Sequence, residues 1–254
     1  MEQLCFRFYG PLNDFLSPHR RQVEFFHWLK EPAAVKDTIE ALGVPHTEVD
    51  LILINGQSEG FYYLLKSGDR VSVFPYFTNL DIAADSRVRP PPPPSIRFVV
   101  DVHLGKLATY LRLLGFDVLY RNDYSDEELA AISCLQERIL LTQDRPLLKR
   151  RMVTYGYFVR SQTPKHQIIE VLQRFDLFAE IMPYRRCLRC NGLLERVDKA
   201  SVADQIPPYT RLFYHDFSRC QSCAQIYWQG AHHRRIQQLI DDIQPSVGSG
   251  VLGR

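Results

Sequence analysis

Four cysteines near the C-terminal end of the sequence form two Cys-x-x-Cys pairs. The first pair is Cys187 and Cys190, the second is Cys220 and Cys223, and 29 residues separate them. Each pair places two sulfur atoms on one tight turn, and two such turns supply the four thiolates of a tetrahedral zinc site. Because protein fills all four positions, we expect a structural rather than a catalytic zinc. Two independent redox pairs are the alternative, but the thioredoxin-like frame of such pairs is not evident.

Acidic residues follow three short apolar segments that have the pattern of strands. Asp101 directly follows residues 95–100, Asp144 lies two residues after 138–142, and Asp126 opens a helix that follows 116–120. Ligands of an open parallel sheet bind beyond the carboxyl ends of its strands. Carboxylates gathered there repel one another unless they share a proton or a cation. We therefore expect a Mg²⁺ or Mn²⁺ site that could activate water for phosphodiester cleavage.

Ordinary structural roles are the alternative for each of these acids. Asp126 and Glu127 at a helix N-terminus interact favourably with the helix dipole, and Asp144 could form a turn before Pro146. Asp101 is explained least well by packing, because an apolar central strand does not require an acid at its end. His103 is a candidate general acid or base, with packing at the start of a helix as the alternative.

The elements that must position these acids alternate between strands and helices. A fourth strand is expected at 157–161, and helices are expected at 103–114, 126–136 and 164–175. Such alternation implies parallel strands joined by right-handed crossovers. Between the cysteine pairs, residues 193–198 and 210–217 are expected to form paired strands, with 201–208 as a loop.

Five consecutive prolines, Pro90–Pro94, favour a stiff polyproline II spacer.

The charge is distributed unevenly along the chain. Up to residue 89 the net charge is −3, whereas residues 90–254 carry a net charge of +5. The basic surplus favours a polyanionic partner such as RNA, with an ordinary solvated surface as the alternative. No stretch of about 18 apolar residues occurs, so no membrane span is expected. The N-terminus lacks a signal-peptide pattern, which makes the cytoplasm the expected compartment.

The segment before the prolines has the element order of a small β-grasp. Its helix is expected at 33–42, and an Asn55-Gly56 turn follows the apolar strand DLILING; further strands are expected at 61–65 and 69–75. Through ALGVPHTEV, LILING and SGDRVSVFP it resembles the ubiquitin-like sulfur-carrier proteins of thiamine and molybdopterin synthesis over about 3–77. Those carriers end in Gly-Gly, which is missing here. We therefore expect a binding or scaffolding role, with a possible protein partner, rather than sulfur transfer.

The segment after the prolines resembles the PIN-like domain of the Mut-seven carboxy-terminal ribonuclease family. The motifs are DVHLGKL from Asp101, YLRLLGFDV from Tyr110, SDEEL from Ser125 and RILLTQDR from Arg138, and the resemblance covers about 96–240, zinc cysteines included. It implies a metal-dependent ribonuclease with acids at Asp101, Asp126 and Asp144. PIN nucleases usually have four acids; Asp123 and Glu127 are candidates for the fourth.

Basic residues near these acids are expected to contact RNA phosphates, because charge neutralisation dominates nucleic-acid affinity. They are Lys106, Arg145, Lys149 and Arg150. A solvated helix face is the alternative for the last two.

The sequence thus predicts an α/β chain. It consists of a ubiquitin-like α+β β-grasp domain (1–88), a proline-rich linker (89–95), a PIN-like parallel sheet with flanking helices (96–180), a zinc ribbon with a C-terminal helix (181–243) and a disordered tail (244–254). The leading hypothesis is a ribonuclease with structural Zn and catalytic Mg or Mn. The alternative is a non-catalytic RNA-binding or adaptor protein that uses the basic C-terminal part and the zinc ribbon.

Overall fold

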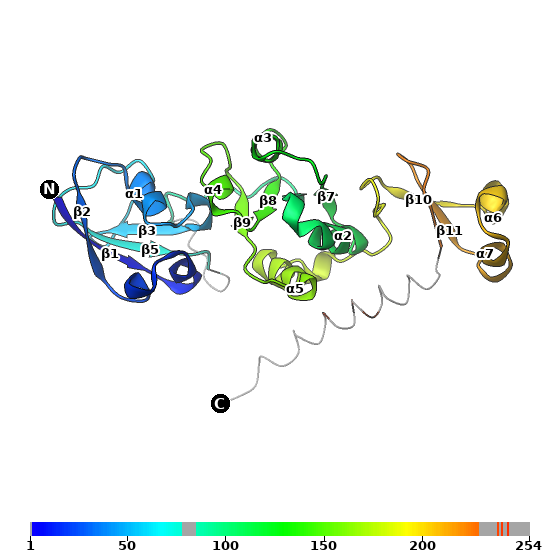
Figure 1. Cartoon of the computed structure of the whole chain (residues 1–254), viewed down its shortest axis with the longest axis horizontal. Coiled ribbons are helices and arrows are strands. Elements are labelled where there is room, and N and C mark those ends of the chain that lie inside the picture. The colour runs from blue at the N-terminus through cyan, green and yellow to red at the C-terminus, as the bar shows by residue number, and fades with distance from the viewer. Residues whose placement is uncertain (1, 78–84, 229–237, 239, 241–242, 244–254) are drawn as a thin grey trace, which may run out of the picture. The chain divides into compact units, whose positions relative to one another are not determined.

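The computed structural model describes residues 2–77, 85–228, 238, 240 and 243 (Figure 1). The chain forms two compact units, one of residues 1–103 and 122–159, the other of residues 104–121 and 160–254. The described part of the chain contains no helix that could cross a membrane. The expected C-terminal helix and the tail lie outside the described residues, except for three helical positions at 238, 240 and 243.

The first unit begins with a five-stranded β-grasp sheet whose strands lie in the order β2-β1-β5-β3-β4. Strands β1 and β5 pair in parallel, and the other neighbours are antiparallel. The strands are β1 (Glu2–Phe8), β2 (Phe25–Leu29), β3 (Leu51–Ile54), β4 (Gln57–Ser58) and β5 (Arg70–Phe74), and the helix is α1 (Val35–Ala41). Short 3₁₀ turns are η1 (Gly10–Phe15), η2 (Pro18–Arg20) and η3 (His46–Glu48).

Buried apolar residues alternate with more exposed ones along β1, so one face of the sheet is buried. Leu4, Phe6 and Phe8 are at most 1% exposed and pack with Val35 and Ile39 of the helix. The β3–β4 turn uses the expected Asn-Gly pair, whose positive φ angles suit a tight hairpin. The strand expected at 61–65 is wrong. That segment makes only an isolated bridge from Leu64 to Ala34, because its carbonyls accept the first N–H groups of α1.

The first unit also contains a parallel sheet in the order β6-β8-β9. Its strands are β6 (Arg97–Val100), β8 (Ile139–Thr142) and β9 (Gly156–Phe158), all paired in parallel. Every residue of β8 is buried, as expected of a central parallel strand. Helix α3 (Asp126–Leu135) packs on β6 and β8, and its N-terminus carries the expected Ser125–Glu128 capping box. The short helix α4 (Arg145–Leu148) contacts β8 and β9.

The second unit has a helical part and a small ribbon. Helix α2 (Gly105–Leu113) follows the turn η4 (Val102–Leu104), and its fully buried leucines face the contact with helix α5 (Pro164–Phe175). Strand β7 (Asp117–Leu119) comes after α2 in the chain, and the turn η5 (Phe178–Glu180) comes after α5. Figure 1 shows α2 and α5 beside each other. The ribbon is an antiparallel sheet of β10 (Leu194–Val197), β11 (Phe217–Cys220) and β12 (Ile226–Trp228).

The link between β10 and β11 differs from the expected loop and long strand. It contains α6 (Lys199–Val202), η6 (Ala203–Gln205) and α7 (Pro208–Phe213), so β11 begins only at Phe217. Proline at the first helical position favours a helix start, which explains why α7 replaces the expected strand. Val202 and Ile206 from this link pack with Phe217 and Ile226 to give the ribbon its own core.

Candidate zinc site and acidic strand ends

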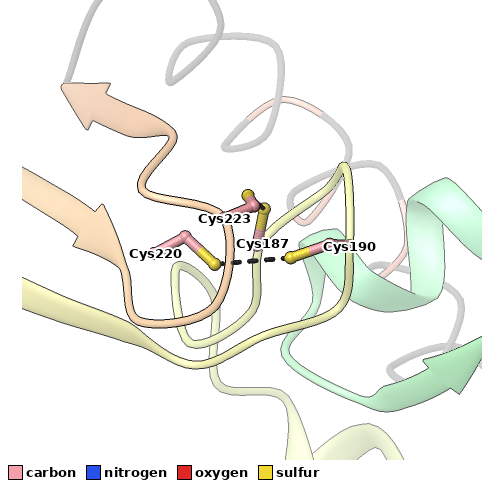
Figure 2. Close-up of side chains that lie close together, drawn as sticks. All are labelled: Cys187, Cys190, Cys220 and Cys223. Carbon is pink, nitrogen blue, oxygen red and sulfur yellow. Dashed lines mark hydrogen bonds between the residues drawn. The ribbon is translucent and has the colours of Figure 1, made fainter.

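Four thiols converge at one end of the ribbon (Figure 2). Cys187 Sγ lies 3.6 Å from Cys223 Sγ, Cys190 Sγ lies 3.4 Å from Cys220 Sγ, and all four sulfur atoms are within 4.8 Å of one another. A tetrahedron with Zn–S bonds of ~2.3 Å has sulfur–sulfur edges of about 3.8 Å, whereas a disulfide bond measures ~2.05 Å. The spacing therefore suits a four-coordinate metal ion such as zinc and excludes disulfides in this arrangement.

The two Cys-x-x-Cys turns have the same backbone geometry. The carbonyl of Cys187 accepts a hydrogen bond from the N–H of Asn191 at 2.9 Å, and that of Cys220 accepts one from Ala224 at 3.0 Å. Asn191 and Ala224 both adopt left-handed backbone angles, φ 68° and 58°. In the second turn, the Ser222 N–H also points at Cys220 Sγ, 3.4 Å away. Each turn thus presents its two sulfurs on the same side, as a metal knuckle requires.

The thiols of this cluster differ in how readily they ionise. Burial opposes ionisation of Cys187, but hydrogen bonds from the Tyr227 hydroxyl, 3.1 Å away, and from backbone N–H groups lower its pKa to about 7. Burial raises the pKa of Cys190 to about 12. Four thiolates so close together need a compensating cation, and a divalent metal ion supplies that charge. The donor set, the spacing and the charge requirement agree on zinc.

Two side chains anchor the first knuckle: Asn191, which the sequence places in the turn after the first cysteine pair, and Arg112, which sequence reasoning missed. Arg112 of α2 is 5% exposed. Its guanidinium donates to the carbonyl of Val118 at 2.9 and 3.0 Å and to that of Leu188 at 3.1 Å. Asn191 accepts from the Val118 N–H at 3.0 Å and donates to Asp117 at 2.9 Å. The sequence offered one indication of this role: Arg112 lies directly after Leu111, next to the apolar face of the helix.

Asp101 lies at the end of β6 and is only 3% exposed. One carboxylate oxygen accepts the hydroxyl of Thr142, the last residue of β8. The other oxygen lies 3.1 Å from His103 Nδ1. The Thr142 hydroxyl in turn accepts the N–H of Asp144 at 2.8 Å. Thr142 therefore links the carboxylate of Asp101 to the backbone of Asp144.

His103 itself is far from buried. Its side chain is 77% exposed, so the expectation that it packs at the start of a helix is wrong. It stays a candidate acid or base beside Asp101.

Asp144 is electrostatically coupled to the other two acids. Burial raises its pKa above the usual range, and the charges of Asp126 and Asp101 raise it further. Asp126 also faces Arg150, 3.7 Å away, and Arg150 pairs with Glu127 at 2.7 Å. In the described ranges, however, only the four cysteines have ligand atoms gathered closely enough to hold a metal ion. The acids share one edge of the sheet without a preformed ligand cage.

The basic residues expected to contact RNA have several different surroundings. Arg145 donates to the carbonyls of Phe15 and Asp14, and Lys149 donates to that of Glu40. Arg150 pairs with Glu127 and Asp126, whereas Lys106 is exposed on α2. Their contacts with RNA remain predictions. Of the candidates for a fourth acid, Glu127 has its pKa lowered by hydrogen bonds from its own backbone and from Arg150.

Two family models match the chain. One, described as the Mut7-C RNAse domain, matches residues 96–240, and the other, described as Mut7-C ubiquitin, matches residues 1–81. Comparison with curated proteins and with solved structures gives no match. The two matched ranges agree with the resemblances found in the sequence, including the ubiquitin-like nature of the N-terminal domain.

Proposed function

The chain belongs to the family of the Mut7-C RNAse domain, and on that premise we propose that it cleaves RNA phosphodiester bonds with a divalent metal ion at Asp101, Asp126 and Asp144. The observation that carries this proposal is the coupling of the acids. The charges of Asp126 and Asp101 contribute to the raised pKa of Asp144, and the Thr142 hydroxyl links the Asp101 carboxylate to the Asp144 backbone. Carboxylates brought near one another at the ends of parallel strands are the ligands that Mg²⁺ or Mn²⁺ prefers.

The roles of the protein groups follow from their hydrogen bonds. Thr142 orients Asp101 by donating to its carboxylate, and the same hydroxyl holds the Asp144 backbone. The exposed His103 ring, hydrogen-bonded to Asp101, is placed to move a proton to a departing or attacking oxygen. A bound Mg²⁺ or Mn²⁺ would activate water and stabilise developing charge on the phosphate. Because the acids are not gathered into a cage, we expect substrate phosphate oxygens to complete the coordination of the metal.

The zinc belongs to a different part of the same proposal. Four cysteine ligands leave no open position, so zinc at Cys187, Cys190, Cys220 and Cys223 would stabilise the ribbon rather than take part in cleavage. We place this activity in the cytoplasm, where reduced thiols are the rule.

A cleavage assay tests the proposed activity. The full-length zinc-loaded protein is incubated with end-labelled single-stranded RNA in Mn²⁺, in Mg²⁺ and in excess EDTA added just before the substrate. Shortened products are expected with either metal and none with EDTA. Cleavage that continues in EDTA would contradict a divalent-metal mechanism.

RNA binding without cleavage is the second candidate, favoured by the absence of a preformed acidic cage among the described residues. It predicts a salt-dependent gel shift, because phosphate contacts release counterions, but intact RNA in every metal tested. A protein that binds RNA at low salt and never shortens it would establish this function in place of the first.

A further inference from the structure

The ubiquitin-like domain contacts the nuclease domain of its own chain. We infer that this contact is a permanent docking interface, in which Phe15, Glu40 and the turn η3 hold α4 and β9. The docked domain thereby fixes the turn that carries Asp144, so it acts as a structural part of the nuclease rather than as a freely tethered module. The consequence for catalysis rests on the function proposed above, whereas the docking itself does not.

The first line of evidence is the edge of the parallel sheet. Strand β9 is the last strand in the order β6-β8-β9, so no strand of the described residues pairs with the other side of its backbone. Glu48, 8% exposed, accepts the outward N–H of Phe158 with its carboxylate at 2.7 Å. An open edge would otherwise invite pairing with other chains, and here a side chain of η3 covers it.

A second contact holds both ends of α4, which begins directly after Asp144. The Arg145 guanidinium lies over the rings of both Phe15 and Phe158, 5.1 and 5.6 Å from their centroids, and donates to the Phe15 carbonyl. The two rings meet edge to face at 5.2 Å. At the other end, Lys149 Nζ donates to the carbonyl of Glu40 at 2.6 Å. Two residues that the sequence suggested for RNA are therefore engaged by the ubiquitin-like domain.

The turn η3 makes a third contact. His46 is 8% exposed, with Nε2 2.9 Å from the carbonyl of Val153 and Nδ1 2.6 Å from Glu40 Oε1. Next to it, a Cβ built on Gly156 would lie 3.3 Å from Thr47 Cγ2. Buried polar groups with partners on the opposite domain are characteristic of a persistent interface, since separation would leave those partners to be solvated again.

The start of the proline segment contacts both domains. Arg89 pairs with Asp50 of the β-grasp, and Pro91 accepts a hydrogen bond from the Tyr155 hydroxyl at 2.8 Å. Both contacts lie at the N-terminal start of the segment, one to each domain, so the tether between the two faces is short and favours the docked state.

A disulfide engineered across this interface tests the docking. The variant is Thr47→Cys with Gly156→Cys in a Cys134→Ser background, and the two single cysteine variants are the controls. A Cβ at position 156 would lie 3.3 Å from Thr47 Cγ2, within the reach of a disulfide, and 2.6 Å from Leu148 Cδ2. The end of the Leu148 side chain must therefore shift in every variant that carries Gly156→Cys, and the Gly156→Cys single variant controls for that shift. The Thr47 hydroxyl is buried without a hydrogen-bond partner among the described residues, so its replacement removes no bond. We expect mild oxidation of the folded, zinc-loaded protein to link peptides 47 and 156 in most molecules. A folded double variant that stays unlinked would overturn the docking.

Positioning of the Asp144 turn is tested by weakening the interface and restoring it. Glu48→Ala should increase amide hydrogen exchange at 143–149 at least tenfold and lower kcat with little change in KM, whereas Glu48→Gln, which keeps an acceptor for Phe158, should stay close to wild type. Oxidising Glu48→Ala combined with the cysteine pair should restore protection, and reduction should abolish it. Unchanged exchange in Glu48→Ala would refute positioning. If the wild type does not cleave RNA, the cross-link and the exchange data still decide the docking, and only the proposed activity fails.

Discussion

Gly192 lies against the cysteine cluster so closely that one added methyl group should weaken metal binding. A Cβ at this position would lie 2.5 Å from Ser222 Oγ, 2.8 Å from Cys220 Sγ and 2.9 Å from Ser222 Cβ. Ordinary contacts of this kind are about 3.5–4.0 Å. Because its φ is not in the left-handed region, the effect of Gly192→Ala is steric rather than conformational.

The size of the effect follows from what must move. The serine hydroxyl can rotate away, but Cys220 Sγ must shift by about 0.5 Å or more, beyond the ~0.2 Å tolerance of a Zn–S bond. Overpacking of a tight site costs ~1–3 kcal/mol. At 1.4 kcal/mol for each factor of ten, zinc affinity should fall by roughly 5- to 150-fold.

Competition with a chromophoric chelator measures this loss, with thermal unfolding as a second readout. Gly60→Ala is the matched control, because its Cβ would meet only ordinary contacts at 3.7 and 4.0 Å. Zinc affinity in Gly192→Ala equal to that of wild type would refute the geometry described for the knuckles.

Two further substitutions have defined outcomes. Arg112→Ala leaves the carbonyls of Val118 and Leu188 without their buried donor. It should lower the free energy of unfolding by about 2–5 kcal/mol in chemical denaturation, because a buried acceptor left without a donor costs about 1–3 kcal/mol. Arg112→Lys should recover part of the loss, and a change below about 1 kcal/mol in Arg112→Ala would contradict the anchoring role. Asp144→Asn should increase the free energy of unfolding by at most about 1 kcal/mol, because solvent screens the charge, while abolishing cleavage; it removes a partly buried charge repelled by Asp126 and Asp101. Since the folded pKa of Asp144 is raised, the wild type loses stability as the pH rises from the unfolded value of ~3.9 through the folded value. The advantage of Asp144→Asn should therefore be absent in strong acid and grow across that window; a constant advantage at all pH values would show that the charge is not its cause.

Features with local signals could be predicted from the sequence. The capping box at Ser125 and Glu128 fixes the start of α3, the Asn55-Gly56 turn fixes a hairpin, and the two Cys-x-x-Cys pairs identify the metal cluster. Each of these features depends on residues that lie within a few positions of one another, so the sequence pattern alone reveals it. The family resemblance in addition predicted the type of each domain, and the two family matches agree with it.

Features that depend on distant contacts could not be predicted in this way. Residues 210–213 are expected from the sequence to begin a strand but form the C-terminal part of α7, since Pro208 starts a helix and the short ribbon core is completed by Val202 and Ile206. Arg145 and Lys149 have the appearance of RNA contacts until the carbonyls of Phe15 and Glu40, more than 100 residues away, are seen to accept their hydrogen bonds. The hydrogen-bond partner of a charged side chain can lie far away in the sequence, and no local pattern identifies it.

The loss of RNA cleavage in Asp101→Asn is the most direct test of the proposed active site. Asp101 is buried at the strand end beside Thr142 and His103, whereas Asp37 is an exposed acid of α1 and provides the matched control as Asp37→Asn. Single-turnover rates in Mn²⁺ should fall by at least 100-fold in Asp101→Asn, because a metal ligand contributes several kcal/mol at 1.36 kcal/mol for each factor of ten. Asp37→Asn should cleave like wild type, with zinc content unchanged in both. Equal cleavage by Asp101→Asn and wild type would contradict the assignment of the active site to these strand ends.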